Sequence, residues 1–193
     1  MSKLLIYIPF FWNYLLIKLC NGKFNSFPKI SGFIFVSGRK GTLEFGERVV
    51  INSSKWANPV GLASQTRFRI LQGASIKIGN NVGISSSIFV AHNSIVIEDN
   101  VNIGGGCQLL DNDFHSLDPI LRLSEQDQAH IASSPIHIKN NAFIGTQCII
   151  LKGVTIGCES IVAAGSIVTK SIPDREVWGG NPARFIRRIR KEI

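Results

Sequence analysis

Aliphatic residues return at every sixth position through the second half of the chain. The series runs without a break over six repeats: Ile138, Ile144, Ile150, Ile156, Val162 and Val168. An α-helix repeats every 3.6 residues and a strand alternates every two, so neither element alone produces this spacing. A period of six predicts a solenoid in which each repeat contributes one short strand and one turn.

The residues between these anchors agree with a solenoid. Four places after each anchor the chain has a small or aliphatic residue, and at two such places Cys107 and Cys148 are predicted to point inward as small apolar fillers. Three places after an anchor the residue is often one that tolerates positive φ. These turn residues are Asn81, Asn100, Gly106, Asn141, Gly153 and Gly165.

The repeat extends upstream with two irregularities. Phe45 and Ile51 indicate a worn early coil, and regular anchors follow at Ile78, Ile84, Val90, Ile97, Ile103 and Leu109. One extra residue before Ile97 predicts a bulge or longer turn near residues 91–94. The pattern then stops over residues 111–135. An excursion of about 25 residues is long unless it is functional, and function in rigid scaffolds concentrates on loops.

Residues 4–19 are strongly apolar and predict a helix. The run is shorter than the roughly 20 residues that span a bilayer, and it lacks the cleavage site of a signal peptide. Three interpretations remain open. The helix packs on the solenoid or on a neighbouring subunit, lies in a membrane interface with Trp12 and Tyr14 among the headgroups, or anchors the chain across the membrane.

The hexads end near Pro173. Asn181 and Pro182 resemble a helix cap and first turn, and an apolar stripe follows, so a short closing helix is predicted over the open end of the last coil. The predicted architecture is mainly β. Residues 1–30 form an N-terminal apolar helical segment, residues 31–173 a β-helix with a loop at 111–135, and residues 174–193 a C-terminal extension and helix.

Composition narrows the range of partners. The 193 residues carry a formal net charge of +8, and five positive charges fall between Arg184 and Lys191. Such a balance suits nucleic acid, an anionic membrane or the phosphates of a cofactor. The chain lacks the aromatic–basic interleaving of single-strand binders, so no nucleic-acid partner is expected. The four cysteines show no C-x-x-C spacing, which favours a reduced, cytoplasmic compartment.

Three motifs are similar to the closing segment of the hexapeptide-repeat acyltransferases, namely GVTIG at 153–157, AGSIVTK at 164–170 and GNPA at 180–183. The resemblance covers about residues 75–190 and extends to the sugar and polysaccharide O-acetyltransferases within that family. It implies a left-handed parallel β-helix with three hexads per coil, assembled as a homotrimer with active sites between subunits. It also implies acetyl-coenzyme A as the acyl donor, and no metal is expected.

The excursion begins with Asp111-Asn112-Asp113-Phe114-His115, where this family keeps a histidine general base. The chemistry needs such a base, because a sugar hydroxyl must lose its proton as it attacks a thioester, and neutral imidazole accepts protons near neutral pH. Asp113 or Asp111 would accept a hydrogen bond from the other ring nitrogen and fix the tautomer. The plainer alternative is that His115 is an exposed loop histidine.

The resemblance also assigns coenzyme and acceptor residues. Backbone groups at Ala164, Gly165 and Ser166 would meet the pantetheine arm, while Lys170 and Arg184 would meet phosphates. His137 either lines the coenzyme channel or is an ordinary outward strand residue.

Ser85 occupies the position where galactoside- and maltose-type members carry an acceptor-binding Asn, which counts against those two acceptors. Ser85 donates a hydrogen bond to the acceptor or stands on a solvated turn. His92, at the slip in the repeat, points into the substrate cleft or stands on a surface turn.

The leading hypothesis is an acetyl-coenzyme A-dependent O-acetyltransferase that acts directly on a saccharide of capsule, exopolysaccharide or lipopolysaccharide. The apolar N-terminus motivates this acceptor, since such glycans are assembled at the inner membrane face, and it suggests peripheral contact with that membrane. N-acylation of an amino-sugar nucleotide or acetylation of a small acceptor is the enzymatic alternative. A zinc enzyme would need histidines in paired spacing, which the chain lacks. The non-enzymatic alternative is a scaffold or membrane-binding module.

Overall fold

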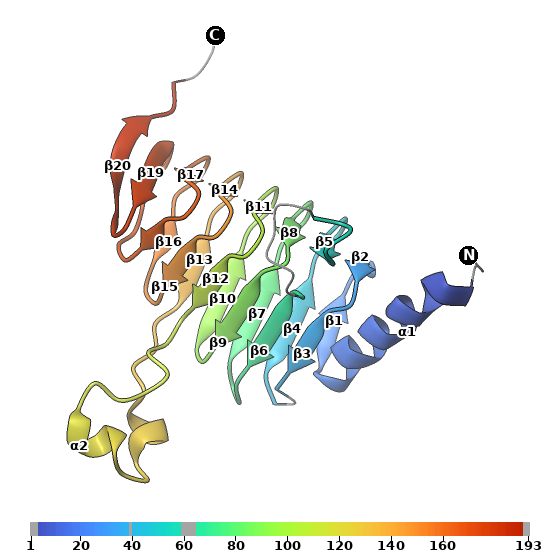
Figure 1. Cartoon of the computed structure of the whole chain (residues 1–193), viewed down its shortest axis with the longest axis horizontal. Coiled ribbons are helices and arrows are strands. Elements are labelled where there is room, and N and C mark those ends of the chain that lie inside the picture. Colours follow the sequence, from blue (N-terminus) through green and yellow to red (C-terminus); the bar gives the residue numbers. More distant parts are fainter. Residues whose placement is uncertain (1–3, 39, 59–64, 191–193) are drawn as a thin grey trace.

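The computed structural model describes residues 4–38, 40–58 and 65–190. Its strands stack into a three-sided prism whose faces are three largely parallel sheets (Figure 1). Successive strands pass from one face to the next, so every third strand from β1 to β18 belongs to the same sheet. This is the left-handed parallel β-helix with three hexads per coil that the sequence and its resemblance predict.

The strands are short, with two to six residues each. Sheet A contains β1 (Gly22–Phe24), β4 (Thr42–Phe45), β7 (Ser75–Ile78), β10 (Ser94–Ile97), β13 (Ile136–Ile138) and β16 (Thr155–Ile156). Sheet B contains β2 (Lys29–Gly32), β5 (Val50–Ser53), β8 (Gly83–Ser85), β11 (Asn102–Ile103), β14 (Phe143–Ile144), β17 (Ile161–Val162), β19 (Glu176–Gly180) and β20 (Ala183–Arg188). Sheet C contains β3 (Phe35–Ser37), β6 (Arg67–Ile70), β9 (Ile88–Ala91), β12 (Gln108–Leu110), β15 (Ile149–Leu151) and β18 (Ile167–Val168).

The core is a set of inward side chains stacked coil on coil. In sheet A, Ile97 pairs in register with Ile138, and Ile138 pairs with Ile156. Every predicted anchor between Ile78 and Val168 is buried. Burying one such side chain contributes on the order of 1.5–3 kcal/mol, so the hexad pattern describes the main source of stability.

One anchor is displaced by a residue from its predicted position. Phe89, and not Val90, lies in register with Phe68 on one side and Leu109 on the other. The rings of Phe68 and Phe89 stack with their centroids 4.9 Å apart. This aromatic contact fills the inside of the early coils, and the turn that follows absorbs the displaced residue.

The predicted turn residues adopt the predicted backbone. All six positions chosen for tolerance of positive φ have φ between 55° and 75°: Asn81, Asn100, Gly106, Asn141, Gly153 and Gly165. Gln147 and Glu159 share this conformation at φ 58°. The corner of the prism therefore imposes the left-handed conformation even on residues whose side chains do not favour it.

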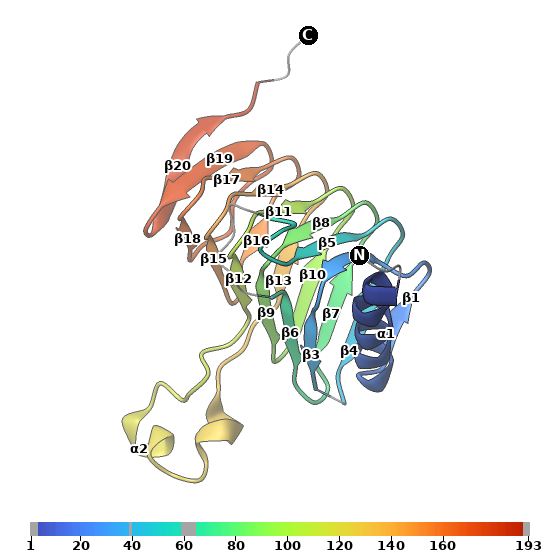
Figure 2. The same cartoon turned by 45° about the vertical axis from the view of Figure 1, so that its right-hand side comes forward.

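The predicted N-terminal helix is present as α1 (Leu4–Leu19) and closes the first coil (Figure 2). Ile17 is fully buried and belongs to the core. Asn13, also fully buried, donates to the Gly32 carbonyl at 2.9 Å and accepts from the Ile34 N–H at 3.0 Å. Packing on the prism, one of the three interpretations of this run, is therefore confirmed for the inner face of α1. Among the described residues, no helix is long and apolar enough to cross a membrane.

The β-helix begins earlier than the predicted boundary at residue 30. Its first strand starts at Gly22 and pairs in parallel with β4. A Cβ at Gly22 would lie 2.2 Å from the Ile17 Cγ2 atom, because α1 fills the inward space that an aliphatic anchor fills in later coils. The first coil therefore has a glycine where later coils have an aliphatic anchor, and the six-residue pattern is lost in its sequence.

The predicted C-terminal helix is wrong. Residues 183–188 form β20, which pairs antiparallel with β19 and closes sheet B. Asn181 and Pro182 make the two-residue turn between these strands, with a cis peptide bond, and Asn-Pro pairs favour turns as well as helix starts. The free edge of sheet B offers backbone hydrogen bonds that an isolated short helix would lack. Residues 191–193 of the predicted helix lie outside the described residues.

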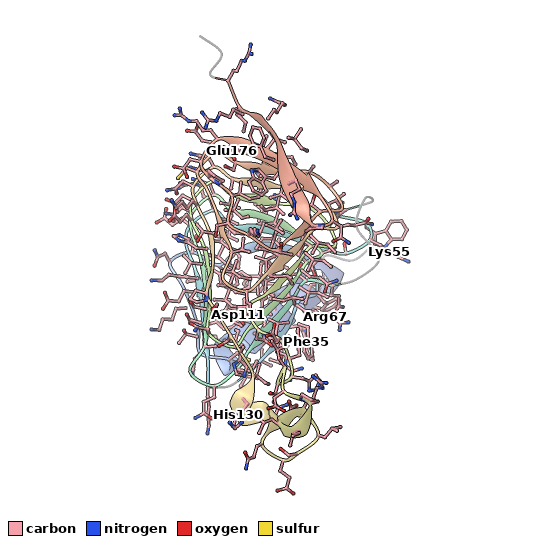
Figure 3. All side chains as sticks on the ribbon, turned by 90° about the vertical axis from the view of Figure 1, so that its left-hand side faces the viewer. Phe35, Lys55, Arg67, Asp111, His130 and Glu176 are labelled. Atoms are coloured by element: carbon pink, nitrogen blue, oxygen red, sulfur yellow. The ribbon has the colours of Figure 1, made fainter. Side chains whose placement is uncertain are left out.

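Residues 111–135 leave the prism at the corner between sheets C and A. The two arms of this excursion pair, with an antiparallel bridge between Asn112 and Ser133 and a bond from the Asp113 N–H to the Ala132 carbonyl at 3.1 Å. The tip carries α2 (Pro119–Arg122) and a 3-10 turn (Asp127–His130). Figures 1 and 3 show this tip projecting well beyond the prism.

Candidate active site

The loop at 111–135 brings one histidine and one carboxylate together. The Nδ1 atom of His115 lies 2.7 Å from the Oδ2 atom of Asp127. A carboxylate only accepts hydrogen bonds, so neutral His115 donates its Nδ1–H to Asp127 and leaves Nε2 unprotonated. The His115 side chain is 63% exposed, whereas that of Asp127 is 12% exposed. The arrangement presents a basic nitrogen to solvent and covers the group that orients it.

Asp127 is itself held in place. Its Oδ1 atom accepts the Ser116 N–H at 2.7 Å. The Ser116 N–H bond and the His115 side chain together lower the pKa of the Asp127 carboxyl below its ordinary value. Asp127 therefore stays ionised down to acidic pH and keeps its preference for the Nδ1-protonated form of His115.

Short-range bonds stiffen the rest of the tip. Asp118 caps α2 by accepting the Ile120 N–H at 2.8 Å. The Arg122 guanidinium donates to the Ser116 carbonyl at 3.0 Å and adds a favourable charge near Asp127. Phe114, next to His115, has φ of 64°, which is an unusual conformation for a bulky side chain. Backbone strain and several side-chain caps therefore converge on His115.

Neither of the aspartates that were predicted to orient His115 is the one that bonds to it. Asp111 is fully buried, and its carboxylate accepts the N–H groups of His92 and Asn93 at 2.7 and 2.8 Å. Asp113 pairs with the Lys152 ammonium at 2.5 Å. Asp111 fixes the turn between β9 and β10. Asp113 ties the two paired arms of the loop, which we call the stalk, to the next coil. The antiparallel stalk keeps both carboxylates at its base. Asp127, which lies on the returning half of the loop, reaches the His115 imidazole instead.

The two acceptor candidates lie at different places on the prism. His92 is half-buried in the turn that follows β9, at the corner where the loop begins. This turn consists of residues 92 and 93 alone, so the extra residue does not appear as a longer turn between the two strands. Ser85 ends β8 on sheet B and lines a shallow hollow with Asn52, Asn102 and Phe143. No contact among the described residues joins Ser85 to His115.

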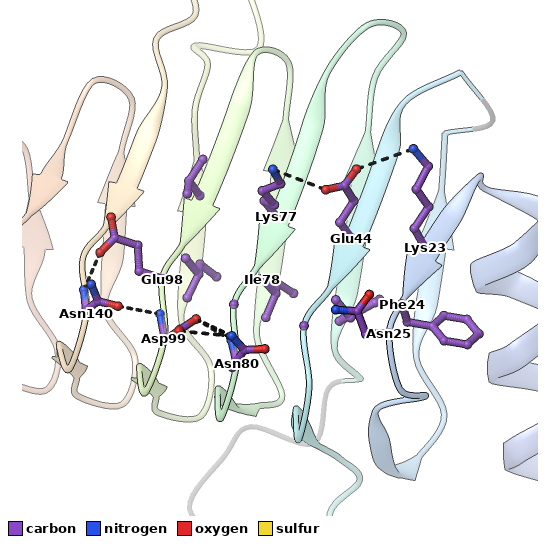
Figure 4. Close-up of a pocket in the computed structure, with 15 residues that line it drawn as sticks. Lys23, Phe24, Asn25, Glu44, Lys77, Ile78, Asn80, Glu98, Asp99 and Asn140 are labelled. Carbon is purple, nitrogen blue, oxygen red and sulfur yellow. Dashed lines mark hydrogen bonds and ion pairs between the residues drawn. The ribbon is translucent and has the colours of Figure 1, made fainter.

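His137 is the middle residue of β13, next to the last strand of sheet A, and points outward. Its Nε2 atom lies 2.6 Å from the Glu98 Oε1 atom, and Glu98 Oε2 accepts the Asn140 N–H at 2.9 Å. Glu98 borders a groove of about 620 Å³ on this face, which Figure 4 shows with its ion pairs from Glu44 to Lys23 and Lys77. The imidazole of His137 is therefore bonded to a carboxylate partner that the sequence pattern did not indicate.

The residues assigned to the pantetheine arm form the turn between β17 and β18. Ala164 and Gly165 are exposed, and a Cβ at Gly165 would meet nothing within 4 Å. Ser166 is fully buried, donates its hydroxyl to the Ala163 carbonyl at 2.5 Å and accepts the Gly180 N–H at 3.1 Å. Its carbonyl also accepts the Ile149 N–H at 2.9 Å, so the side chain and the carbonyl are both committed to the fold.

The two basic candidates are separated. Arg184 is exposed on β20 opposite Gly179, and the Gly180 bond to Ser166 fastens this hairpin to the β17–β18 turn. Lys170 is exposed beyond β18, at the corner of the prism that also carries Lys152. The structure therefore groups Arg184 with the turn at 164–166 and leaves Lys170 nearer the base of the loop.

Metal-binding residues do not cluster in the part of the chain that the structure describes, where no group of three or more His, Cys, Asp or Glu side chains converges. The remaining loop histidine, His130, bonds through Nδ1 to the Gln126 carbonyl at 3.0 Å and is exposed. Figure 3 shows His130 at the tip, well away from Asp111 at the prism corner. It has no carboxylate partner among the described contacts, unlike His115.

Four residues that contact the candidate side chains were not predicted from the sequence: Asp127, Arg122, Lys152 and Glu98. Asp127 is one of three acidic residues that follow His115 in the loop, with Asp118 and Glu125, and its 12-residue separation from His115 follows no regular period. The only available signal was the rule that a catalytic histidine needs an orienting carboxylate. That rule restricts the choice to the acidic residues of the loop without selecting one.

Comparisons with known proteins agree with the prism and its repeats. The family model described as "Hexapeptide repeat of succinyl-transferase" matches residues 135–170. The galactoside O-acetyltransferase of Escherichia coli strain K12 is 37% identical over 117 residues, which cover 58% of this chain and 56% of that protein. The chain therefore spans less than two thirds of the length of this curated relative.

Solved structures give the same picture. A hexapeptide-repeat acetyltransferase of Vibrio cholerae in complex with acetyl-coenzyme A is 33% identical, with a TM-score of 0.55 over 60% of this chain and 61% of that one. A galactoside acetyltransferase in complex with coenzyme A is 26% identical, with a TM-score of 0.58 over 92% of this chain and 69% of that one. Both similarities extend from sequence to fold.

Proposed function

Because the chain belongs to the hexapeptide-repeat acyltransferase family, we propose that it is an acetyl-coenzyme A-dependent O-acetyltransferase with His115 as its general base. The observation that carries this proposal is the 2.7 Å contact between His115 and Asp127. It leaves Nε2 free, exposed and unprotonated, which is the state that a general base requires. Asp127 acts as the positioning residue.

In the proposed reaction the acceptor hydroxyl attacks the thioester carbonyl carbon while Nε2 of His115 takes the hydroxyl proton. The tetrahedral intermediate then expels the coenzyme A thiolate, which breaks the carbon–sulfur bond. The proton passes from His115 to the sulfur, so the products are the acetyl ester and free coenzyme A. Asp127 stabilises the transient imidazolium, as a carboxylate does in other acyl-transfer sites. No covalent acyl-enzyme is required.

The coenzyme is assigned to the C-terminal coils. The exposed turn at Ala164 and Gly165 leaves open space beside the chain, and the basic side chain of Arg184 stands on the hairpin fastened to that turn. We assign the pantetheine arm to this turn and the phosphates to Arg184, with Lys170 as a second cation. In this proposal His137 lines the channel on sheet A. Solved relatives that contain acetyl-coenzyme A or coenzyme A support the choice of donor.

The proposed enzyme is a homotrimer with active sites between subunits. The loop that carries His115 projects beyond its own prism (Figure 1), and the His115 side chain remains 63% exposed. A second wall from a neighbouring subunit would cover the imidazole and exclude water from the thioester. The loop geometry favours this arrangement because the stalk carries the histidine away from its own coils.

The proposed acceptor is a saccharide hydroxyl in surface polysaccharide biosynthesis, and the proposed compartment is the cytoplasm. A relative whose name specifies a galactoside supports the sugar class. Ser85 in place of the acceptor-binding Asn argues against a simple galactoside, and His92 at the loop corner is the second candidate contact. The four cysteines lack paired C-x-x-C spacing, which supports a reducing compartment.

The decisive experiment replaces His115 by alanine. Turnover of acetyl-coenzyme A with a saccharide acceptor is measured from the coenzyme A thiol that is released. This turnover should fall by roughly 10²–10⁴-fold. Calorimetric binding of coenzyme A should be retained, since His115 lies outside the coenzyme turn. His130→Ala is the matched control, because it removes an exposed histidine from the same loop and should leave turnover unchanged. Near-normal turnover of the His115 variant would overturn the assignment.

A further inference from the structure

The outer face of α1 is an apolar surface that the prism does not cover. Its exposed side chains follow helical spacing at i, i+3, i+4, i+7 and i+11: Ile8, Phe11, Trp12, Leu15 and Leu19, each more than half exposed. Buried Asn13 and Ile17 lie on the opposite face and fasten the helix to the first coil. The apolar face is therefore held in a fixed orientation, pointing away from the protein. We call these five residues the outer stripe.

The N-terminal segment that contains the outer stripe is rich in positive charge. Six of the 21 lysines and arginines, and none of the 13 acidic residues, fall in the first 43 positions, so this stretch carries six of the net +8 charges. Lys18, Lys23 and Lys29 are exposed on α1, β1 and β2. The Lys18 ammonium lies 4.4 Å from the centre of the Phe24 ring, which keeps it beside the helix. The remaining 150 residues carry only +2, so the charge is concentrated at this end.

An apolar hollow lies next to the helix. Pro9, Phe10 and Phe27 line it with Lys29 at its border, and its volume is about 550 Å³. The Phe10 and Phe27 rings meet edge to face at 4.9 Å, and the Phe24 ring adjoins Phe27. A hollow with aromatic walls and a basic border suits an acyl chain whose phosphate stays near the lysine.

We propose that this end of the protein binds the surface of an anionic lipid bilayer, with α1 lying in the plane of the headgroups. The outer stripe enters the boundary between headgroups and acyl chains, and Lys18, Lys23 and Lys29 contact lipid phosphates. Trp12 occupies the interface, where an aromatic ring with a polar N–H is favoured. A second copy of the chain is a poorer partner, because it would bring another six positive charges against the first six. This inference does not depend on the proposed reaction.

Flotation of the full-length protein with phospholipid vesicles tests the proposal. The protein should float with phosphatidylcholine vesicles that contain phosphatidylglycerol, and added salt should weaken this binding. Phe11→Ser combined with Leu15→Ser should reduce binding by about tenfold or more. Trp56→Ser is the matched control, since Trp56 is 86% exposed but lies outside the N-terminal region, and it should bind as the wild type does.

A second set of variants tests the charge. Replacing Lys18, Lys23 and Lys29 by Gln should weaken binding on the order of fivefold per lysine. Replacing Arg187, Arg188 and Arg190 by Gln removes the same charge from the opposite end of the prism and should leave binding intact. If both triple variants lose binding equally, total charge and not the α1 end is responsible, and the proposal is wrong.

Two further outcomes would overturn the proposal. One is a wild-type protein that fails to float with the anionic vesicles. The other is a wild-type protein that sediments as a larger assembly than the Phe11 and Leu15 double variant does. A second copy of the chain would then cover the outer stripe. Thermal unfolding of that variant, monitored by circular dichroism, should match the wild type, because both replaced side chains are exposed.

Discussion

In the prism, each inward side chain touches residues of the same kind in the coils above and below, whereas in the loop the orientation of His115 depends on one carboxylate 12 residues away. The first arrangement is redundant, because every coil repeats the contact. The second has no substitute within the loop. A change in the prism should therefore alter the stability of the fold, and a change in the loop tip should alter turnover while the fold persists.

The largest expected effect on stability comes from truncating one inward-facing aliphatic side chain. Ile144 is fully buried in sheet B between Ile103 and Val162. Ile144→Ala should lower the free energy of unfolding by about 2–5 kcal/mol, because it opens a cavity in a packed column. Denaturant titration measures the loss, and turnover per folded molecule should not change.

Phe143 supplies the control for that substitution. It precedes Ile144 on the same strand but points outward and is 47% exposed. Phe143→Ala should cost much less stability than Ile144→Ala. Equal losses would show that inward and outward positions do not differ as the hexad pattern requires.

The next largest effect separates two aspartates that share the same local physics. A backbone N–H lowers the pKa of each carboxyl, from Asn80 for Asp99 at a prism corner and from Ser116 for Asp127 in the loop. Asp127→Asn should reduce turnover by about 10²-fold, since the amide no longer selects the tautomer of His115. Asp99→Asn should leave turnover unchanged. Steady-state kinetics of the two variants side by side decides the point.

The pH dependence of stability provides a second test of Asp99 and Asp127. A carboxyl whose pKa is lowered by folding stabilises the protein above its unfolded pKa near 4, and this contribution disappears as the pH falls through the lower folded value. Each Asn variant should therefore lose less stability than the wild type between about pH 4 and pH 2. An acid-unfolding curve for Asp127→Asn that matches the wild-type curve would contradict the assigned contact.

The prism was predictable from sequence because its physics is periodic. Anchors such as Ile138 and Val162 and turn residues such as Asn100 repeat a local rule, so each repeat supports the next. The predictions failed where one contact outweighed the pattern. Examples are the ring stack that places Phe89 inward and the sheet edge that draws residues 183–188 into a strand.

The loop was predictable only in part. Its position and His115 followed from the interrupted repeat and the resemblance, but its internal contacts have no period. Asp111 and Asp113 lie within four residues of His115 along the chain, yet the antiparallel stalk keeps them at its base. Asp127 approaches His115 only because the tip folds back through α2 and the 3-10 turn. When the fold of the loop tip determines which carboxylate bonds to the histidine, the spacing of residues in the sequence does not identify it.

The smallest expected effect tests how strictly a prism corner enforces its backbone. Gly73 lies in the turn between β6 and β7 with φ of 80°, and a Cβ there would meet nothing within 4 Å. Gly73→Ala should therefore cost only the conformational penalty of the left-handed region, about 1 kcal/mol, and lower the Tm by about 2–4 °C. Gly73→Asn should cost less, because Asn tolerates positive φ better than Ala does. Calorimetric melting of both variants measures the difference. An Ala variant as stable as the wild type would show that this corner relaxes to another conformation, unlike the corners that hold Gln147 and Glu159 at φ 58°.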